Sequence, residues 1–246
     1  MKNLHYETSQ ISSYFSENRI RWDQFYNSEK NLFQSIELSS KDKVLDIGCG
    51  CGGLGLALNE KFDISCYTGI DINAAAIEAG RLLSPSSNLI HGDILDVTSG
   101  SLSGQVFDLV CSLSCIDWNV QFSEMLSAAW AHVKPGGKFV ATFRLCLDEG
   151  NSDVTKSYQY INYDGKKEGE IAAYVVLNFH DLISQLTMLD PSEILGNGYW
   201  GPPSSSAVTP YESLCFVALS IKKRNKGENK KINIDLDLPN DVLRTL

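Results

Sequence analysis

Residues 44–55 read V-L-D-I-G-C-G-C-G-G-L-G, an apolar run that ends in Asp46-Ile47 and is followed by alternating glycines. A short apolar run bounded by glycine is typical of a buried strand, and the apolar residues that follow recur at helical spacing. The stretch therefore predicts a strand at 43–47, a tight glycine turn and a helix at 53–62. Glycine lets a backbone turn sharply and approach a ligand closely, and the free N–H groups of the helix start point to the same place.

Strand-like and helix-like segments keep alternating downstream of this turn. Strands are predicted at 67–72, 88–91, 107–114 and 138–145, and helices after Asn73, a suitable N-cap, and over 122–133. Pro135-Gly136-Gly137 is interpreted as the stop of the second helix. Alternation of this kind predicts an α/β fold, a Rossmann-like doubly wound sheet of about seven strands, mostly parallel.

The pattern changes after residue 147. Two β-like runs within 157–177 flank Asp164-Gly165, which predicts a hairpin or a lid inserted in the fold. A helix near 180–189 and strands at 193–199 and 214–221 follow, and the last two strands are expected to form an antiparallel edge. We therefore expect an N-terminal helical cap (1–40), a main domain (41–224, with 147–177 as the lid) and a C-terminal tail (225–246).

Composition and charge narrow the functional classes. The 246 residues carry a formal net charge of −9, which disfavours a nucleic-acid substrate, because proteins that bind phosphate backbones usually present a basic face. The polar start indicates no signal peptide, and no apolar run reaches the length of about 18 residues that indicates a membrane span. Seven cysteines, mostly in apolar segments, favour free thiols in a reducing cytoplasm. Cys49 and Cys51 lack partners for zinc, so no metal site is expected.

Two acids end the first two predicted strands. In an open parallel sheet, ligands bind at the carboxyl ends of the strands, and a carboxylate such as Asp71 can accept both hydroxyls of a ribose. A dinucleotide site requires G-x-G-x-x-G and a pyrophosphate near the helix start, where the charge of Asp46 is unfavourable. The glycine spacing here is also G-x-G-x-G, over Gly48, Gly50 and Gly52. Asp46 instead suits a ligand with a positive centre, such as an amino group or a sulfonium, which disfavours a nicotinamide oxidoreductase.

Five motifs together resemble those of the class I S-adenosylmethionine-dependent methyltransferases. In order they are D-I-G-C-G-C-G, G-I-D-I, G-D-I-L, F-D-L-V-C-S-L-S and H-V-K-P-G-G-K-F, over about residues 40–146. The flanking W-D-Q-F-Y-N-S-E and S-Y-Q-Y-I-N-Y-D-G stretches are similar to uncharacterised bacterial members. The resemblance implies S-adenosyl-L-methionine as cofactor, with Asp46, Gly48 and Gly50 on its methionine part, Asp71 on the ribose, and Asp93 with Ile94 on the adenine. The implied cofactor-binding set is Asp46, Gly48, Cys49, Gly50, Asp71, Ile72, Asp93, Ile94, Ser112, Leu113 and Ser114, the last three beside the methyl group.

No motif fixes the acceptor half of the site. The segment 115–119 leaves the carboxyl end of the fourth strand, where an acceptor must lie, and Asp117 is the candidate catalytic residue, as a base or an orienting group. Its alternative role is the N-cap of the next helix. Two roles are predicted for Arg144 as alternatives: it binds an anionic acceptor, or it pairs with an acid inside the protein. The aromatic residues of the cap and insert also have two alternative roles. They stack on a flat or sugar-like substrate, or they pack the lid onto the main domain. The candidate substrate-binding residues are Trp22, Tyr26, Trp118, Asn119, Arg144, Tyr160, Tyr199 and Trp200.

These observations predict methyl transfer to an oxygen or nitrogen of a small-molecule acceptor, such as a sugar or another metabolite. One alternative is a protein or RNA methyltransferase, which the acidic charge and the lid disfavour. Nucleobase and glutamine acceptors are also disfavoured because no Asn-Pro-Pro-Tyr-like sequence follows the fourth strand. Another alternative is a non-catalytic S-adenosylmethionine-binding module. We expect no nucleic-acid or membrane partner, and a homodimer is left open.

Overall fold

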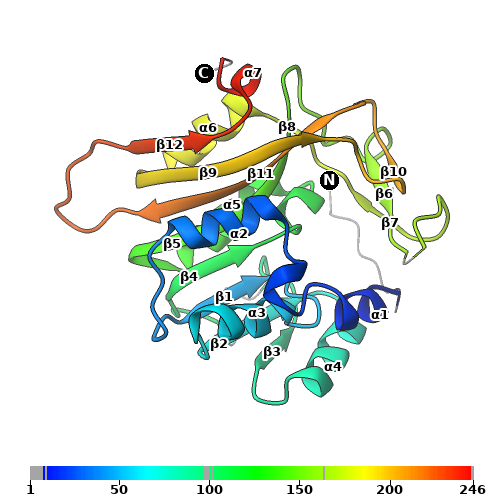
Figure 1. The fold of residues 1–246 in the computed structure, drawn as a ribbon, viewed down its shortest axis with the longest axis horizontal. Helices are drawn as coiled ribbons and strands as arrows, with labels where there is room; N and C mark the ends of the chain where they lie inside the picture. The colour runs from blue at the N-terminus through cyan, green and yellow to red at the C-terminus, as the bar shows by residue number, and fades with distance from the viewer. Residues whose placement is uncertain (1–7, 9, 97–99, 101, 163, 245–246) are drawn as a thin grey trace.

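One large sheet runs through the computed structural model, which describes residues 8, 10–96, 100, 102–162 and 164–244 (Figure 1). The strand order is β12-β9-β11-β5-β4-β1-β2-β3, with β8 beside β5. The strands are β1 (Val44–Ile47), β2 (Tyr67–Asp71), β3 (Asn88–His91), β4 (Phe107–Ser112), β5 (Val133–Cys146), β8 (Leu177–Asn178), β9 (Pro191–Gly201), β11 (Leu214–Lys223) and β12 (Asn233–Asp237). Among these described strands, β11 alone runs antiparallel to its neighbours. The predicted Rossmann-like sheet is confirmed.

Helices cover both faces of this sheet. They are α1 (Gln10–Glu17), α2 (Asn27–Ser35), α3 (Gly53–Phe62), α4 (Ala74–Leu83), α5 (Phe122–Ala131), α6 (Phe179–Met188) and α7 (Asn240–Leu243), with the 3₁₀ turns η1 (Trp22–Gln24) and η3 (Ile116–Trp118). Successive strand residues point to opposite faces, so Leu109 and Cys111 join a core with α2 and α3. Val110 joins a second core with α5 and α6. Across the described residues, no helix has the length and apolar character needed to cross a lipid bilayer.

The helices beside the predicted ligand site begin where the sequence indicates. The side chain of Asn73 accepts a hydrogen bond from the N–H of Ala76, so Asn73 caps α4 as predicted. The stop of α5 is different, because the helix ends at Ala131, before Pro135-Gly136-Gly137. These three residues lie inside β5, and Gly136 has a φ of +76°. The β4–β5 register shifts between Phe107 and Leu109, so the Pro-Gly-Gly stretch makes an irregular strand start rather than a helix stop.

The sheet is larger than the expected seven strands. β9 and β11 pair in antiparallel fashion, as predicted, but β12 then pairs in parallel with the outer side of β9. β8 adds a further short strand beside the end of β5. Residues 233–237 read N-I-D-L-D and are mostly exposed. The acids on this outer strand discourage pairing with another chain.

The insert forms a second, smaller sheet. The predicted hairpin is present as β6 (Tyr158–Tyr160) and β7 (Ile171–Ala173), which pair in antiparallel fashion. A short strand from the Gly/Pro/Ser loop, β10 (Ala207–Val208), joins β6. Figure 1 shows this small sheet and α1 on the same side of the molecule, at the right.

Candidate active site

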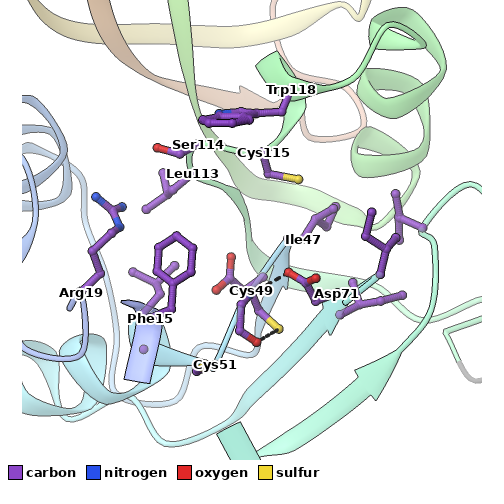
Figure 2. Close-up of a pocket in the computed structure, with 18 of the residues that line it drawn as sticks. Phe15, Arg19, Ile47, Cys49, Cys51, Asp71, Leu113, Ser114, Cys115 and Trp118 are labelled. Carbon is purple, nitrogen blue, oxygen red and sulfur yellow. Dashed lines mark hydrogen bonds between the residues drawn. The ribbon is translucent and has the colours of Figure 1, made fainter. Parts of the chain in front are cut away.

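A cavity of about 120 Å³ lies at the carboxyl ends of β1, β2, β3 and β4 (Figure 2). Parallel strands bring the residues that follow them to one edge of the sheet, where α/β folds bind ligands. Ten of the predicted cofactor-binding residues line this cavity: Asp46, Gly48, Cys49, Gly50, Asp71, Ile72, Asp93, Ile94, Leu113 and Ser114. Ser112 does not; it is the last residue of β4, and its buried hydroxyl has no hydrogen-bond partner.

The glycine turn after β1 forms one wall of this first cavity. Gly48 has a φ of +75° and Gly50 a φ of +54°, backbone conformations that favour glycine. A Cβ atom at Gly48 would lie 2.3 Å from Sγ of Cys115, so a side chain has no room there. The N–H of Gly48 donates to the carbonyl of Ile70 over 2.8 Å. The turn is therefore fixed to β2 while its bare backbone faces the cavity.

Asp71 joins the glycine turn to the start of α4. Its Oδ2 accepts a hydrogen bond from the N–H of Gly50 and its Oδ1 one from the N–H of Asn73, both over 2.8 Å. Burial raises the pKa of Asp71, while these two hydrogen bonds lower it. Each carboxylate oxygen has a second lone pair, so Asp71 keeps the capacity to accept further donors from a ligand.

Asp46 is the second buried acid of the first cavity. Burial raises its pKa to about 7, and the hydrogen bond from Tyr67 opposes that rise. The donor is the Tyr67 hydroxyl, which lies 2.7 Å from Oδ2 of Asp46. A carboxyl with a pKa near neutrality gains most from a cationic ligand, because a nearby positive charge favours its ionised form.

A second and larger cavity, of about 620 Å³, adjoins the first. Its walls come from the N-terminal segment, η3, β5, the small sheet and the residues around β9 and β11. Four residues line both cavities: Phe15, Arg19, Ser114 and Trp118. Figure 2 shows Trp118 above the first cavity, with Ser114 and Cys115 just below its ring. The two cavities are therefore adjacent spaces with a common wall.

Asp117 and Arg144 form a buried ion pair in the wall of the second cavity. Oδ2 of Asp117 lies 3.3 Å from Nε of Arg144, and both side chains are about 5% exposed or less. Arg144 also donates to the backbone carbonyl of Asp117 over 2.9 Å. Burial raises the pKa of Asp117 to about 6, although the positive charge of Arg144 lowers it. Oδ1 of Asp117 is buried and has no hydrogen-bond partner.

These contacts decide between the alternatives for both residues. Arg144 pairs with an internal acid, and its guanidinium contacts two rings, 3.8 Å from the Tyr174 centroid and 4.7 Å from the Trp118 centroid. Asp117 is not the N-cap of α5, since that position is occupied by Gln121. Asp117 therefore has no capping role there, and it is one of the residues that line the second cavity.

The predicted substrate-binding residues divide into three groups. Five line the second cavity: Tyr26, Trp118, Arg144, Tyr160 and Tyr199. Asn119 lines the first cavity instead, and its side chain accepts from the N–H of Gln121. Trp22 and Trp200 line neither cavity.

The two remaining tryptophans have structural contacts. The ring of Trp22 packs edge-on against Phe62, with 5.2 Å between centroids. Nε1 of Trp200 donates to Asp241 over 3.0 Å, which joins β9 to α7. Both tryptophans thus make contacts within the protein, which agrees with the alternative that such aromatic residues have a structural role.

The candidate site residues from the sequence do not include Phe15 and Arg19, which line both cavities. Both guanidinium NH groups of Arg19 donate to the buried carboxylate of Glu29, over 2.9 and 3.2 Å. The guanidinium also lies 4.4 Å from the Phe25 ring centroid. Arg19 has a φ of +59° and follows the short helix α1. No motif marks such a position, and only the concentration of aromatic residues before the first strand pointed to this segment.

The comparison with protein families agrees with this geometry. Residues 45–139 match a family described as a methyltransferase domain. Over these residues the chain is therefore similar to methyltransferase domains. The matched region runs from β1 into β5 and contains the glycine turn, Asp71 and Asp93.

Proteins with different names are similar to parts of this chain. The chain is 33% identical over 96 residues to a trans-aconitate 2-methyltransferase of Deinococcus radiodurans, covering 39% of this chain and 35% of that protein. It is 26% identical over 176 residues to the 18S rRNA (guanine(1575)-N(7))-methyltransferase of Saccharomyces cerevisiae, covering 66% and 62%. The chain thus spans less than two thirds of the length of either relative.

A solved structure supports the fold beyond the methyltransferase domain. The phosphoethanolamine N-methyltransferase 2 of Haemonchus contortus, in complex with phosphomonomethylethanolamine and S-adenosylhomocysteine, matches with a TM-score of 0.56. The identity is 14%, over 79% of this chain and 51% of that chain. At this identity the likeness concerns the fold alone.

Proposed function

We propose that this chain is an S-adenosylmethionine-dependent methyltransferase that transfers a methyl group to an oxygen or nitrogen of a small molecule. The observation that carries the proposal is the pair of adjacent cavities with a common wall at Phe15, Arg19, Ser114 and Trp118. Direct methyl transfer requires donor and acceptor to meet in line with water excluded, and such alignment can supply about 7–11 kcal/mol of the barrier.

The first cavity fits the cofactor by the chemistry of its side chains. Asp71 has free lone pairs for two ribose hydroxyls, and Asp46 is a buried acid that favours a cationic ligand. Asp93 and Ile94 also line the cavity and are the residues proposed to contact the adenine. When bound, S-adenosylmethionine supplies a methyl group already activated on a sulfonium. These residues of the chain bind and orient it.

The second cavity fits a small acceptor. Its volume of about 620 Å³ is within the range of small-molecule sites, about 300–1,000 Å³. Asp117 is the acid in its wall, with a free oxygen and a pKa raised to about 6 by burial. It is therefore suited to orient an acceptor hydroxyl or amine, or to take its proton near neutral pH.

An RNA acceptor is the second candidate, because one relative is named as an rRNA methyltransferase. The net charge of −9 disfavours it. The two arginines that line the second cavity are also paired, Arg19 with Glu29 and Arg144 with Asp117. We therefore favour the small molecule.

Titration calorimetry with S-adenosylmethionine, S-adenosylhomocysteine and NADH tests the proposal. We expect dissociation constants of about 1–100 μM for the two adenosyl ligands and no heat with NADH. A matched titration with Asp63→Asn, an exposed acid outside both cavities, should reproduce the parent affinity. Absence of adenosyl-ligand binding would reject the proposed function.

A further inference from the structure

Aromatic rings form much of the lining of the second cavity. Nine aromatic residues from different parts of the chain line it: Tyr14, Phe15, Tyr26, Trp118, Phe143, Tyr160, Tyr174, Tyr199 and Phe216. Tyr199 and Phe216 lie on paired strands with 5.9 Å between ring centroids and 32° between their planes. Flat rings pack best against flat partners. Together with the volume of about 620 Å³, this lining favours a planar ligand of one or more fused rings.

The charges of the cavity wall are already neutralised within the protein. The Arg19 guanidinium donates to both oxygens of Glu29, which is fully buried. The Arg144 guanidinium pairs with Asp117 and is covered by Trp118 and Tyr174. An anionic ligand would compete with these pairs, and breaking a buried pair is costly. The cavity therefore selects an uncharged molecule over a carboxylate or phosphate.

Two polar atoms of opposite hydrogen-bonding type have no partner in this wall. Oδ1 of Asp117 is an acceptor and Nε1 of Trp118 is a donor, and both are buried without a hydrogen bond. Both side chains flank the same guanidinium, since Arg144 contacts the Asp117 carboxylate and the Trp118 ring. A buried polar atom without a partner is costly. A ligand that supplies one donor and one acceptor removes both costs.

We propose that the acceptor is an uncharged, planar heteroaromatic molecule that presents an N–H or O–H donor to Asp117 and a carbonyl or ring acceptor to Trp118. This inference rests on the proposed function and names its substrate class. In the transfer, the acceptor nitrogen or oxygen forms the new bond to the methyl carbon as the bond from that carbon to sulfur breaks. The sulfur keeps the electron pair of the broken bond, and the proton of the acceptor passes to Asp117 or to water.

Matched ring compounds test the two hydrogen bonds separately by titration calorimetry, each with and without saturating S-adenosylhomocysteine. 2-Quinolone has an adjacent N–H and C=O, N-methyl-2-quinolone lacks the donor, and indole lacks the carbonyl. We expect 2-quinolone to bind about tenfold more tightly than either. Quinoline-2-carboxylate, of similar shape but anionic, should bind at least as weakly as the N-methyl compound.

Two substitutions assign the preferences to their residues. Trp118→Phe removes the indole N–H and keeps a ring, so it should abolish the preference for 2-quinolone over indole and keep the preference over N-methyl-2-quinolone. Asp117→Asn keeps the shape of the side chain and should reduce the preference for 2-quinolone over N-methyl-2-quinolone. Thermal unfolding of both variants shows whether the fold is retained.

The outcomes separate this inference from the proposed function. If 2-quinolone binds no better than N-methyl-2-quinolone or indole, or if the carboxylate binds most tightly, the inferred acceptor class is wrong. The class is also wrong if both preferences survive both substitutions. Binding of S-adenosylhomocysteine in the same titrations tests the proposed function. If S-adenosylhomocysteine does not bind, the proposed function fails, and the titrations without it still measure the ligand preferences of the second cavity.

Discussion

The hydroxyl of Tyr67 donates a hydrogen bond of 2.7 Å to Oδ2 of Asp46, inside a cavity whose burial raises the pKa of that acid to about 7. The two residues lie on the neighbouring strands β1 and β2. The tyrosine therefore holds in place an acid that is near the midpoint of its titration at neutral pH.

This relationship predicts a pH dependence of cofactor binding. A cationic ligand favours ionised Asp46, so below a pH of about 7 binding must release a proton and the affinity should fall, toward about tenfold per pH unit. Calorimetry between about pH 6 and 8, in buffers with different heats of ionisation, measures both the affinity and the proton released. Asp46→Asn should flatten the profile. A flat profile in the parent protein would contradict the prediction.

Tyr67→Phe should move this pH dependence upward. Burial raises the pKa of Asp46, and the hydrogen bond from Tyr67 lowers it. Removal of this hydrogen bond should therefore raise the pKa of Asp46 further. The fall in affinity should begin at a higher pH than in the parent protein, while affinity at high pH changes less. A shift to lower pH would show that the hydrogen bond does not stabilise the ionised acid.

The same pKa bears on the stability of the ligand-free protein. The pKa of Asp46 is higher in the folded state than its ordinary value of 3.8, so the folded state binds the proton more tightly. This contribution to stability is present below a pH of about 4 and is lost as the pH rises through about 7. Urea unfolding of the parent and of Asp46→Asn should therefore show the parent losing stability relative to the variant across that interval.

Asp71→Asn should weaken binding of S-adenosylhomocysteine by about tenfold or more, because hydrogen bonds to a charged group contribute about 1.5–3 kcal/mol each. The amide keeps one acceptor oxygen, whereas Asp71 uses both oxygens for the N–H groups of Gly50 and Asn73. Calorimetry measures the loss, and circular dichroism checks that the turn and α4 remain folded. Affinity equal to that of the parent would remove the ribose role assigned to Asp71.

Gly48→Ala should destabilise the protein more than Gly104→Ala. Both glycines have a positive φ, +75° and +70°, so both substitutions carry a similar backbone cost, about 1–3 kcal/mol. A Cβ at Gly48 would lie 2.3 Å from Cys115, whereas one at Gly104 would meet nothing within 4 Å. The difference between the two unfolding free energies, measured in urea, isolates the clash. Equal destabilisation would mean that Cys115 moves aside freely.

Removal of one member of the buried pair Asp117–Arg144 should be strongly destabilising. Arg144→Met leaves a buried carboxylate without its cation, at a cost of about 3–5 kcal/mol. The double variant Arg144→Met/Asp117→Leu should recover part of that loss. Recovery should be incomplete, since Arg144 also donates to the carbonyl of Asp117 over 2.9 Å. Urea unfolding of the three variants gives the coupling energy, and strictly additive losses would contradict the pairing.

The part of the fold that the sequence predicts best is the alternating region from β1 to β5. There β1 and β4 are mostly apolar and buried, as expected for central strands of a parallel sheet, and the predicted helix at 53–62 coincides with α3. The extra strand β12 was not predicted, because its mostly exposed N-I-D-L-D sequence resembles a polar tail. β10 has only two residues, too few for any periodicity.

The candidate site divides in the same way. Asp46 and Asp71 are predictable because each ends a strand, and a strand end in a parallel sheet has a defined position. Phe15 and Arg19 are not predictable, since their place at the cavities depends on how the N-terminal segment packs across the strand ends. Trp22 packs against Phe33 and Phe62, whereas Tyr26 lines the second cavity, and residue type alone could not separate a core contact from a cavity wall.

Phe15, Arg19, Ser114 and Trp118 line both cavities, so ligands bound in the two cavities would contact the same four side chains. Whatever free energy one occupant gains from the other's presence, the second gains equally, because coupling between two binding sites is reciprocal. Under the proposed function, a demethylated cofactor that remains bound would change the affinity for an acceptor and for the methylated product. Substitution of any of these four side chains should then change the two affinities together.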